Sequence, residues 1–324
     1  MVRVSVIIPL YNKEPYVRRA LLSVAAQTFG DYEVIVVDDG SEDAGARVVE
    51  SFARESGAGA RLRLVRQQNA GPGAARNRGV EEARGELVAF LDADDEWLPG
   101  YLEECARLLE GGGREAAAVT CGYYRHPPGE SCEPMWRARG LSEGVARVAP
   151  DTPPALFVSM LAYMSPCTTV ARRETVRRWG GFYARGRCLY AEDAHLWMKV
   201  LLNETVLLSL KPLARFHVEA SGLSGNLAGA RPVEPFLEDP SEVEAACPER
   251  LRPLLGRVLA ARAFKTACVL GYWGDWRGAR RLARRYGSVE GGWRLPYYLP
   301  SLVCRTPLGP ALGRAWRALA RTGR

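Results

Sequence analysis

The sequence predicts an α/β fold with a mostly parallel central sheet flanked by helices, followed by a helical C-terminal extension. Short, β-branched apolar runs alternate with helical patterns through the first hundred residues, which is typical of parallel strands joined by right-handed crossovers. The runs are apolar on both faces, as strands of a buried parallel sheet are. The strand-like runs stop after residue 226. We therefore expect residues 1–226 to form the α/β domain and residues 227–324 a mainly helical, basic region.

Predicted strands and helices alternate in the N-terminal part of the chain. Four buried strands are expected, over residues 4–8, 34–37, 62–65 and 87–91. Helices are expected after the first three, where apolar residues recur at helical spacing over residues 11–29, 41–52 and 74–83. Ser41 is of a residue type that caps helix N-termini, so we expect the second helix to begin there.

The middle of the sequence is less regular. Residues 125–155 are rich in Pro, Gly and charged residues, and this composition predicts a long loop. The alternating pattern then resumes, with strands expected over 168–171 and 205–208 and helices over 173–179 and 192–202. Residues 232–240 are expected to form a linker before the helices of residues 241–324.

Charge is distributed unevenly along the chain. The 324 residues include 44 Lys and Arg and 37 Asp and Glu, which gives a formal net charge of +7. Residues 1–249 carry a net charge of −7, whereas residues 250–324 carry +14. With 47% apolar and 25% charged residues, the composition is that of a globular protein and excludes a disordered tail or a collagen-like repeat.

The eight cysteines and the apolar runs bear on the cellular compartment. No two cysteines lie closer than eleven residues, so the spacing lacks a CxxC zinc or redox motif, and reduced thiols are expected. The short run at residues 4–10 is strand-like and unlike a signal peptide. No uninterrupted apolar stretch of about 20 residues occurs, as a spanning helix would need. We expect a cytoplasmic protein that could also attach peripherally to the inner face of the membrane.

Polar residues follow three of the predicted strands, in the segments Pro9–Asn12, Asp38–Ser41 and Asp92–Asp95. Ligands of open α/β sheets bind at this carboxyl edge of the strands. Clustered carboxylates there would repel one another unless a cation lies among them, and a hard divalent metal with substrate phosphates would remove that repulsion. The alternative is that these residues form turns and helix caps, with Asp95 as the cap of a helix containing Trp97.

Four motifs occur in the order Ser5–Asn12, Val36–Ser41, Gly71–Gly79 and Phe90–Asp95. They resemble the ordered motifs of a family 2 glycosyltransferase of the GT-A fold, of the type that builds bacterial cell-surface or exopolysaccharide glycans. The resemblance covers roughly residues 3–226. It implies a nucleotide-sugar donor and a divalent metal, Mn²⁺ or Mg²⁺. A dinucleotide-binding domain is disfavoured, since the chain has neither a Walker A motif nor GxGxxG.

The resemblance assigns the donor site as follows. Pro9, Tyr11 and Asn12 would line the base and ribose pocket, and Asp39 would accept a base N–H as in members that use uridine donors. Asp92 would contact ribose or a metal-bound water. The metal would be held by Asp94, with His217 beside it. From its place near the start of a helix, Arg76 could reach a phosphate or a base carbonyl, or it could lie on a solvated helix face.

The resemblance extends to the acceptor half of the site. The segment Ala191–Trp197 is similar to the Glu-Asp motif of the family, in which the Asp is the proposed catalytic base, and this maps to Asp193. Glu192 would support it, and His195 and Trp197 would belong to the acceptor site. An Asp at a helix N-terminus can also be a cap. The sequence departs from the family pattern at His195 and at Glu219-Ala220, where Pro-Gly is more usual.

Taken together, the residues and the resemblance predict an inverting, metal-dependent transferase that moves a sugar, from a UDP-sugar in our expectation, to a glycan or lipid-linked acceptor hydroxyl. The alternative is a non-catalytic nucleotide-sugar-binding or scaffold subunit of a glycan assembly complex. Beyond Arg250, arginines interleave with aromatic residues. This pattern favours an anionic membrane surface as partner. A helical bundle with an aromatic core is the next alternative, and nucleic acid is disfavoured.

Overall fold

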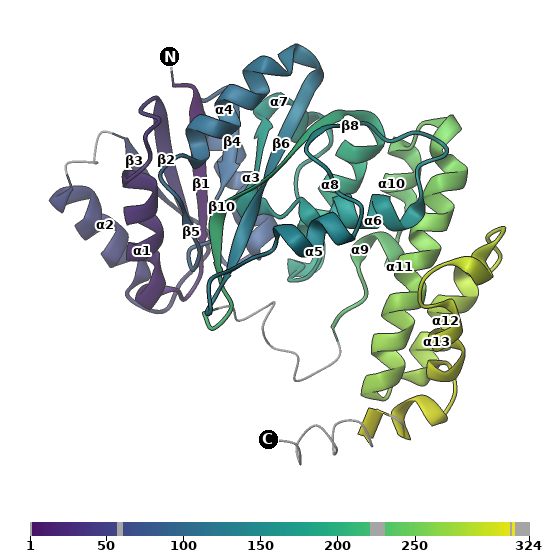
Figure 1. The fold of residues 1–324 in the computed structure, drawn as a ribbon. Coiled ribbons are helices and arrows are strands. Elements are labelled where there is room, and N and C mark those ends of the chain that lie inside the picture. The colour runs from purple at the N-terminus through teal and green to yellow at the C-terminus, as the bar shows by residue number, and fades with distance from the viewer. Residues whose placement is uncertain (1, 57–60, 221–230, 312, 315–324) are drawn as a thin grey trace. The chain divides into compact units, whose positions relative to one another are not determined.

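The computed structural model describes residues 2–56, 61–220, 231–311 and 313–314 (Figure 1). The chain divides into two compact units. The first contains residues 1–147 and 160–225, and the second contains residues 148–159 and 226–324. Assignment of residues 148–159 to the second unit was not indicated by the sequence patterns.

A single mixed sheet forms the centre of the first unit. Along its main path the described strands are β3 (Leu62–Arg66), β2 (Tyr32–Asp38), β1 (Val4–Leu10), β4 (Leu87–Phe90), β9 (Thr169–Arg172), β6 (Ala116–His126), β10 (Thr205–His217) and β5 (Glu96–Trp97). Strands β3, β2, β1 and β4 are parallel to one another, as expected, and β6 and β10 form a second parallel pair. Strand β9 lies between these groups and is antiparallel to both neighbours.

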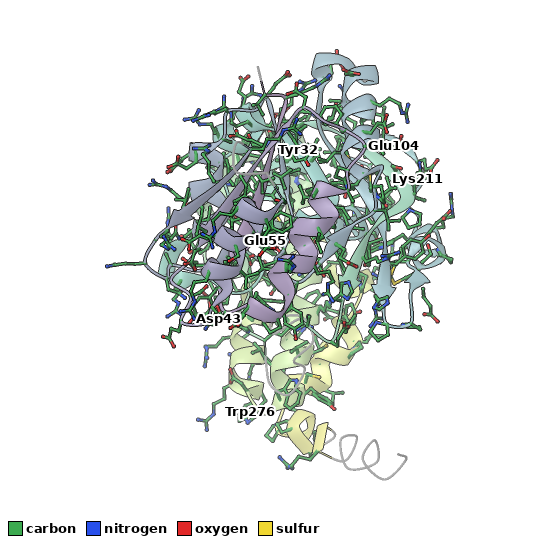
Figure 2. All side chains as sticks on the ribbon, turned by 90° about the vertical axis from the view of Figure 1, so that its left-hand side faces the viewer. Tyr32, Asp43, Glu55, Glu104, Lys211 and Trp276 are labelled. Atoms are coloured by element: carbon green, nitrogen blue, oxygen red, sulfur yellow. The ribbon has the colours of Figure 1, made fainter. Side chains whose placement is uncertain are left out.

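Helices cover both faces of the sheet. Alternate residues of β1, such as Val6 and Ile8, join a buried apolar cluster with α1 (Glu14–Ala25), α2 (Gly45–Glu55) and α4 (Tyr101–Gly111). The opposite face carries α3 (Pro72–Glu82), which contacts β1, β2 and α8 (Glu192–Asn203). Helices α1 and α2 lie side by side, and Glu55 marks the end of α2 in Figure 2. Burial on both faces explains the continuous apolar runs of β1 and β2.

Close packing of α3 on β1 explains one glycine of the third motif. A Cβ atom at Gly79 would lie 2.3 Å from Cγ2 of Ile7, a buried residue of β1. We expect Gly79→Ala to lower the free energy of unfolding by about 1–3 kcal/mol, because the helix must move off the strand. Denaturant unfolding would measure this. Gly111→Ala in α4 is the matched control, since nothing lies within 4 Å of its added Cβ. An unchanged stability in Gly79→Ala would contradict the close packing.

Several predictions about the connecting segments were wrong. The expected loop over residues 125–155 contains α5 (Glu133–Ala138), the start of α6 (Pro154–Tyr163) and two short strands, β7 (Glu130–Ser131) and β8 (Gly144–Ala146). These strands pair with β6 and β10 and have only two or three residues, too few for an alternating pattern. Helix α2 begins at Gly45, so Ser41 does not cap it. Asp95 is likewise no helix cap, because Trp97 lies in β5.

The described part of the second unit is helical, as expected. Its main helices are α9 (Pro235–Glu238), α10 (Ser241–Ala246), α11 (Arg252–Trp273), α12 (Trp276–Arg285) and α13 (Tyr298–Cys304), and α9 lies within the predicted linker. Both α12 and α13 pack against α11. Asp275 caps α12, its Oδ1 accepting the Gly278 amide at 2.7 Å. In the part of the chain that is described, no helix has the length and apolar character needed to cross a membrane.

Candidate active site

The loop Asp92–Asp95 follows β4 at the carboxyl edge of the parallel strands, and each of its three carboxylates accepts from a different N–H group. Asp92 accepts from Arg76 at 2.7 Å, and Asp94 accepts from Nζ of Lys13 at 2.5 Å. Oδ1 of Asp95 accepts the backbone amide of His217 at 2.9 Å. The repulsion expected between these groups is therefore reduced by donors from β10, α3 and the loop after β1.

Arg76 is buried in α3 and joins two parts of the site. Its guanidinium donates to Asp92 Oδ1 and to Glu192 Oε1, both at 2.7 Å, and lies 5.4 Å from the centre of the Phe182 ring. Burial alone would raise the pKa of Asp92, but the guanidinium outweighs it and holds that pKa below its ordinary value. The arginine thus connects the loop after β4 to the first turn of α8. It does not lie on a solvated helix face.

Asp193 is half-buried in the first turn of α8. Burial and the neighbouring Glu192 raise its pKa to about 7, although Arg76 lowers it. The N-cap of this helix is Ala191, and it has a left-handed conformation with φ 58°. Asp193 is therefore not the N-cap, although its Oδ1 accepts the amide of the adjacent Ala194 at 2.8 Å. A carboxylate with a pKa near neutrality can take up a proton at physiological pH.

Two residues predicted for the acceptor site lie in the interior. Trp197 is completely buried and its ring packs edge-on against Phe90 and Phe182, at 6.5 and 5.7 Å between ring centres. His195 is also buried, with its ring 5.0 Å from that of Tyr183. Neither side chain is exposed enough to touch an acceptor directly. Their contribution is to hold α8, and with it Asp193, against the sheet.

Asp39, predicted to bind a base, is buried and already accepts three hydrogen bonds. Its Oδ1 accepts from Gln67 Nε2 at 2.8 Å and from the Ala70 amide at 2.9 Å. Its Oδ2 accepts the amide of Gly71 at 2.8 Å. These bonds tie the end of β2 to the loop that leads into α3. Asp39 thereby positions the helix that carries Arg76.

The other predicted nucleotide residues lie where β1 ends. Tyr11 is exposed and Pro9 is half-buried. Asn12 is left-handed, with φ 50°, and its Oδ1 accepts the amide of Glu42 at 2.8 Å. Its own amide donates to Ser41 Oγ at 3.1 Å. Asn12 therefore connects the loops after β1 and β2. The exposed Tyr11 is the residue directly before it.

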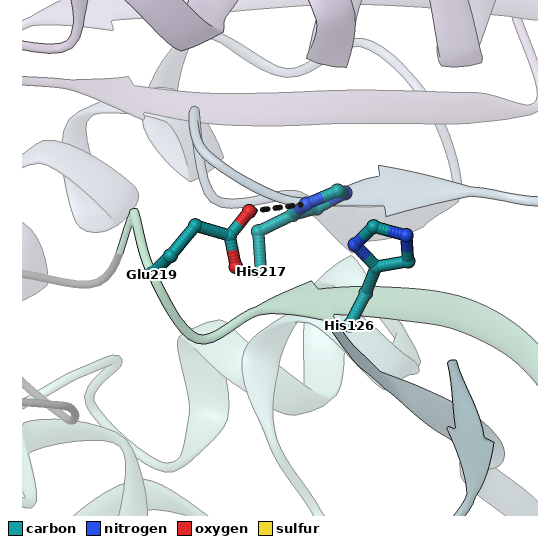
Figure 3. Close-up of side chains that lie close together, drawn as sticks. All are labelled: His126, His217 and Glu219. Atoms are coloured by element: carbon teal, nitrogen blue, oxygen red, sulfur yellow. Dashed lines mark hydrogen bonds and ion pairs between the residues drawn. The ribbon is translucent and has the colours of Figure 1, made fainter. Parts of the chain in front are cut away.

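His217 lies at the end of β10 between two carboxylates. Nε2 is 2.9 Å from Glu96 Oε2, and Nδ1 is 3.1 Å from Glu219 Oε1, as Figure 3 shows for the second pair. The ring of His126 lies 4.9 Å away, between centres. Within the described residues, His126, His217 and Glu219 form one group that could hold a metal. Asp94 is not part of that group.

A second group with metal-ligand potential consists of Asp92, Asp95 and Cys167. The Cys167 Sγ lies 3.1 Å from Asp92 Oδ2 and 3.2 Å from Asp95 Oδ2, so its single S–H donates to one of these carboxylates at a time. Burial and the two carboxylates raise the pKa of this thiol well above its ordinary value, so it is protonated. Mn²⁺ and Mg²⁺ prefer oxygen ligands, so Cys167 supports the loop by hydrogen bonding rather than ligating such an ion.

The carboxylates of Asp92 and Asp94 suit a hard divalent ion, which prefers oxygen ligands. Burial and the charge of Asp92 raise the pKa of Asp94 despite its contact with Lys13. A cation beside Asp94 would favour its charged form and so offset the effects of burial and of Asp92. Lys13 itself was missed by the sequence analysis, as were Cys167 and Glu96. Lys13 directly follows Asn12 of the first motif and was the easiest of these to find.

Comparisons with known proteins show what the chain is similar to. The model of the family described as Glycosyl transferase family 2 matches residues 5–154. This part of the chain is similar to family 2 glycosyltransferases. The matched region includes the loop Asp92–Asp95, whereas α8 with Asp193 lies beyond it. One relative is the succinoglycan biosynthesis protein ExoW of Rhizobium meliloti, 46% identical over 105 residues, which are 32% of this chain and 32% of ExoW. The matches cover about a third of the length of such curated relatives.

Solved structures of two glycosyltransferases share the fold of this chain. TarS of S. aureus, residues 1–349 with UDP-GlcNAc, superposes with a TM-score of 0.60 at 20% identity, over 90% of this chain and 91% of that chain. The mannosyltransferase PcManGT of Pyrobaculum calidifontis, with GDP-Man and Mn²⁺, gives 0.58 at 22% identity, over 98% of this chain and 87% of that chain. The predicted GT-A fold class is confirmed.

Proposed function

We propose that the chain is an inverting glycosyltransferase that moves a sugar from a nucleoside-diphosphate sugar to an acceptor hydroxyl. One observation carries the proposal: buried Arg76 bridges Asp92 at the end of β4 and Glu192 beside Asp193. This bridge brings a carboxylate loop suited to a nucleotide diphosphate next to a carboxylate with a pKa of about 7. A site that only bound a donor would have no need of the second group.

In this proposal the donor binds along the carboxyl edge of β1, β2 and β4. The exposed Tyr11 ring and Pro9 would line the base pocket, together with Asn12, and Asp39 would reach the base or position the loop around it. The structure of TarS with UDP-GlcNAc and that of PcManGT with GDP-Man support a nucleotide sugar as donor. We favour a UDP-sugar because of the family resemblance of Asp39.

Asp94 and Asp92 would hold Mn²⁺ or Mg²⁺, and His217 would join them by exchanging its contact with Glu96 or Glu219 for the ion. When bound, such an ion stabilises the negative charge that develops on the leaving diphosphate. The oxygen ligands of the loop and the raised pKa of Asp94 support this role. The complex of PcManGT with Mn²⁺ is a precedent in a protein of the same fold.

Asp193 would act as the general base. Its carboxylate would take the proton from the acceptor hydroxyl as that oxygen attacks the anomeric carbon, on the face opposite the diphosphate. Attack from that face inverts the configuration of the sugar. Glu192 would act indirectly, because it accepts from Arg76 and its charge raises the pKa of Asp193. A glycan or lipid-linked acceptor is supported by the name of ExoW, a succinoglycan biosynthesis protein.

The enzyme and the alternative of a scaffold subunit predict different results in a donor assay. If the chain is an enzyme, incubation with UDP-, GDP- and TDP-sugars and Mn²⁺ or Mg²⁺ should release a nucleoside diphosphate from one donor class. Anomeric configuration of the product, read by NMR with an added glycan acceptor, tests inversion. Tight donor binding in calorimetry without any transfer or hydrolysis would support the scaffold and overturn the enzyme.

We expect Asp94→Asn to weaken Mn²⁺ binding in the presence of UDP by about tenfold or more, because one anionic ligand is lost. Transfer should fall in parallel, and chelation should abolish it in the native protein. Calorimetric titration of Mn²⁺ measures the affinity. Glu55→Gln on the exposed end of α2 is the control and should change neither quantity. Full activity of the native protein in a chelator would rule out the metal.

A further inference from the structure

Helix α12 in the second unit presents four arginines on one face. Arg277, Arg280, Arg281 and Arg284 recur at helical spacing, and all four side chains are exposed. The opposite face consists of buried small and apolar residues, Gly278, Ala279, Leu282 and Ala283. The buried face packs against α11. The four arginines form a continuous positive stripe, which we call the α12 stripe.

Helix α13 is unusual because its apolar face is exposed. Leu299, Leu302 and Val303 are spaced as one side of a helix, and their exposed fractions are 69%, 42% and 39%. A helix of a globular protein normally buries such a stripe against the core. Leu308, just beyond the helix, is 65% exposed. Exposed apolar residues that gather in this way mark an interaction surface.

Aromatic and basic side chains border this apolar face. Trp293 and Tyr297 precede α13 and are both exposed, and the Arg294 guanidinium lies 4.6 Å from the Trp293 ring centre. Helices α12 and α13 contact each other, so the α12 stripe and the apolar face belong to adjoining surface (Figure 1). Tryptophan and tyrosine between apolar and cationic residues are typical of side chains at a membrane–water interface.

We propose that α12 and α13 form a docking surface for an anionic lipid bilayer. The leucines and Val303 of α13 enter the headgroup boundary, Trp293 and Tyr297 lie at the interface, and the α12 stripe binds lipid phosphates. The docking surface is independent of glycosyl transfer and holds whether or not that function is correct.

Charge and polarity together select the bilayer over other partners. Residues 250–324 have 16 basic and two acidic residues, so two copies facing each other through this surface would repel. A nucleic acid would satisfy the α12 stripe but would leave Leu299 and Leu302 exposed to water. A bilayer with anionic headgroups satisfies both parts, since apolar burial and electrostatic attraction add.

Flotation of the full chain with phosphatidylcholine vesicles, with and without phosphatidylglycerol, tests the proposal. We expect binding to the anionic vesicles only, weakened by salt. Arg280→Gln/Arg281→Gln should lower the partition coefficient about 25-fold, because each basic residue near the surface contributes about fivefold. Leu299→Asn/Leu302→Asn should lower it about tenfold or more.

Matched controls separate this surface from general charge and apolar exposure. Arg47→Gln/Arg54→Gln removes two exposed arginines from α2, and Leu22→Asn/Val145→Asn removes two residues that are 52% and 71% exposed. Both should bind vesicles as the native chain does. Circular dichroism checks that every variant is folded.

Three results would overturn the proposal. The first is vesicle binding that neither surface variant reduces more than its control. The second is a dimer in sedimentation velocity that Leu299→Asn/Leu302→Asn dissociates, with no vesicle binding, which would make a second copy the partner. The third is binding of a single-stranded oligonucleotide that depends on the α12 stripe, again without vesicle binding.

Discussion

Asp193→Asn is expected to retain donor binding and to lose sugar transfer by about 100-fold or more, the range of a positioned general base. The substitution keeps the size of the side chain and its contact with the Ala194 amide, but an amide cannot accept the hydroxyl proton. Calorimetry with the nucleotide sugar measures binding, and single-turnover transfer measures the chemical step. Glu174→Gln in α7 (Arg173–Arg178), an exposed carboxylate outside the site, is the control.

The pH dependence of transfer tests the same assignment independently. Burial and Glu192 raise the pKa of Asp193 to about 7, so the base is protonated and inactive below that pH. We therefore expect kcat/KM to rise with pH through about 7 and to level above it. Glu192→Gln removes the neighbouring charge and should move this rise to lower pH. Equal loss of donor binding and transfer in Asp193→Asn, with no change in the pH profile of Glu192→Gln, would indicate a structural role.

Arg76→Met is expected to cost about 3–5 kcal/mol of unfolding free energy, because it leaves the carboxylates of Asp92 and Glu192 without their buried partner. Urea unfolding measures the loss. Arg78→Met is the matched control in the same helix. Its arginine is exposed and pairs with Glu82, so we expect about 0.5 kcal/mol or less.

A second variant keeps this prediction testable if Arg76→Met does not fold. Arg76→Lys retains the charge but not the two-pronged contact with Asp92 and Glu192, so stability should fall by a smaller amount. Because Arg76 lowers the pKa of Asp193, its loss should also shift the rise of activity to higher pH. A stability within about 1 kcal/mol of the native value would contradict the bridging role.

Much of the α/β domain could be predicted because its strands are buried on both faces. Residues of β1, β2 and β4 are mostly apolar for this reason, and the runs at 4–8, 34–37 and 87–91 are visible in the sequence. Strand β6 was missed because it begins with three alanines, which favour helix as much as strand. Strands β7 and β8 depend on pairing with β6 and β10, a long-range contact that no local pattern records.

The candidate site residues also fall into two groups, those that the sequence places and those whose position only the folded chain shows. The strand pattern was sufficient to place Asp92 and Asp94 at the carboxyl edge of the parallel strands, where loops meet in space. Asp193 was proposed from the resemblance of the segment Ala191–Trp197 to a family motif. Sequence could not separate residues that face the site from those that face the core. Trp197 and His195 lie within a few residues of Asp193 on one helix, yet both are buried on its inner side.

By itself, the sequence determined the class of fold, the position of the carboxylate loop and the division between an acidic domain and a basic C-terminal region. These follow from local composition and periodicity. Only the tertiary structure decided which donor neutralises which carboxylate: Arg76 for Asp92 and Glu192, and Lys13 for Asp94. Such pairings join residues 16 to 116 positions apart. Their strength depends on burial and distance, which exist only once the sheet has formed.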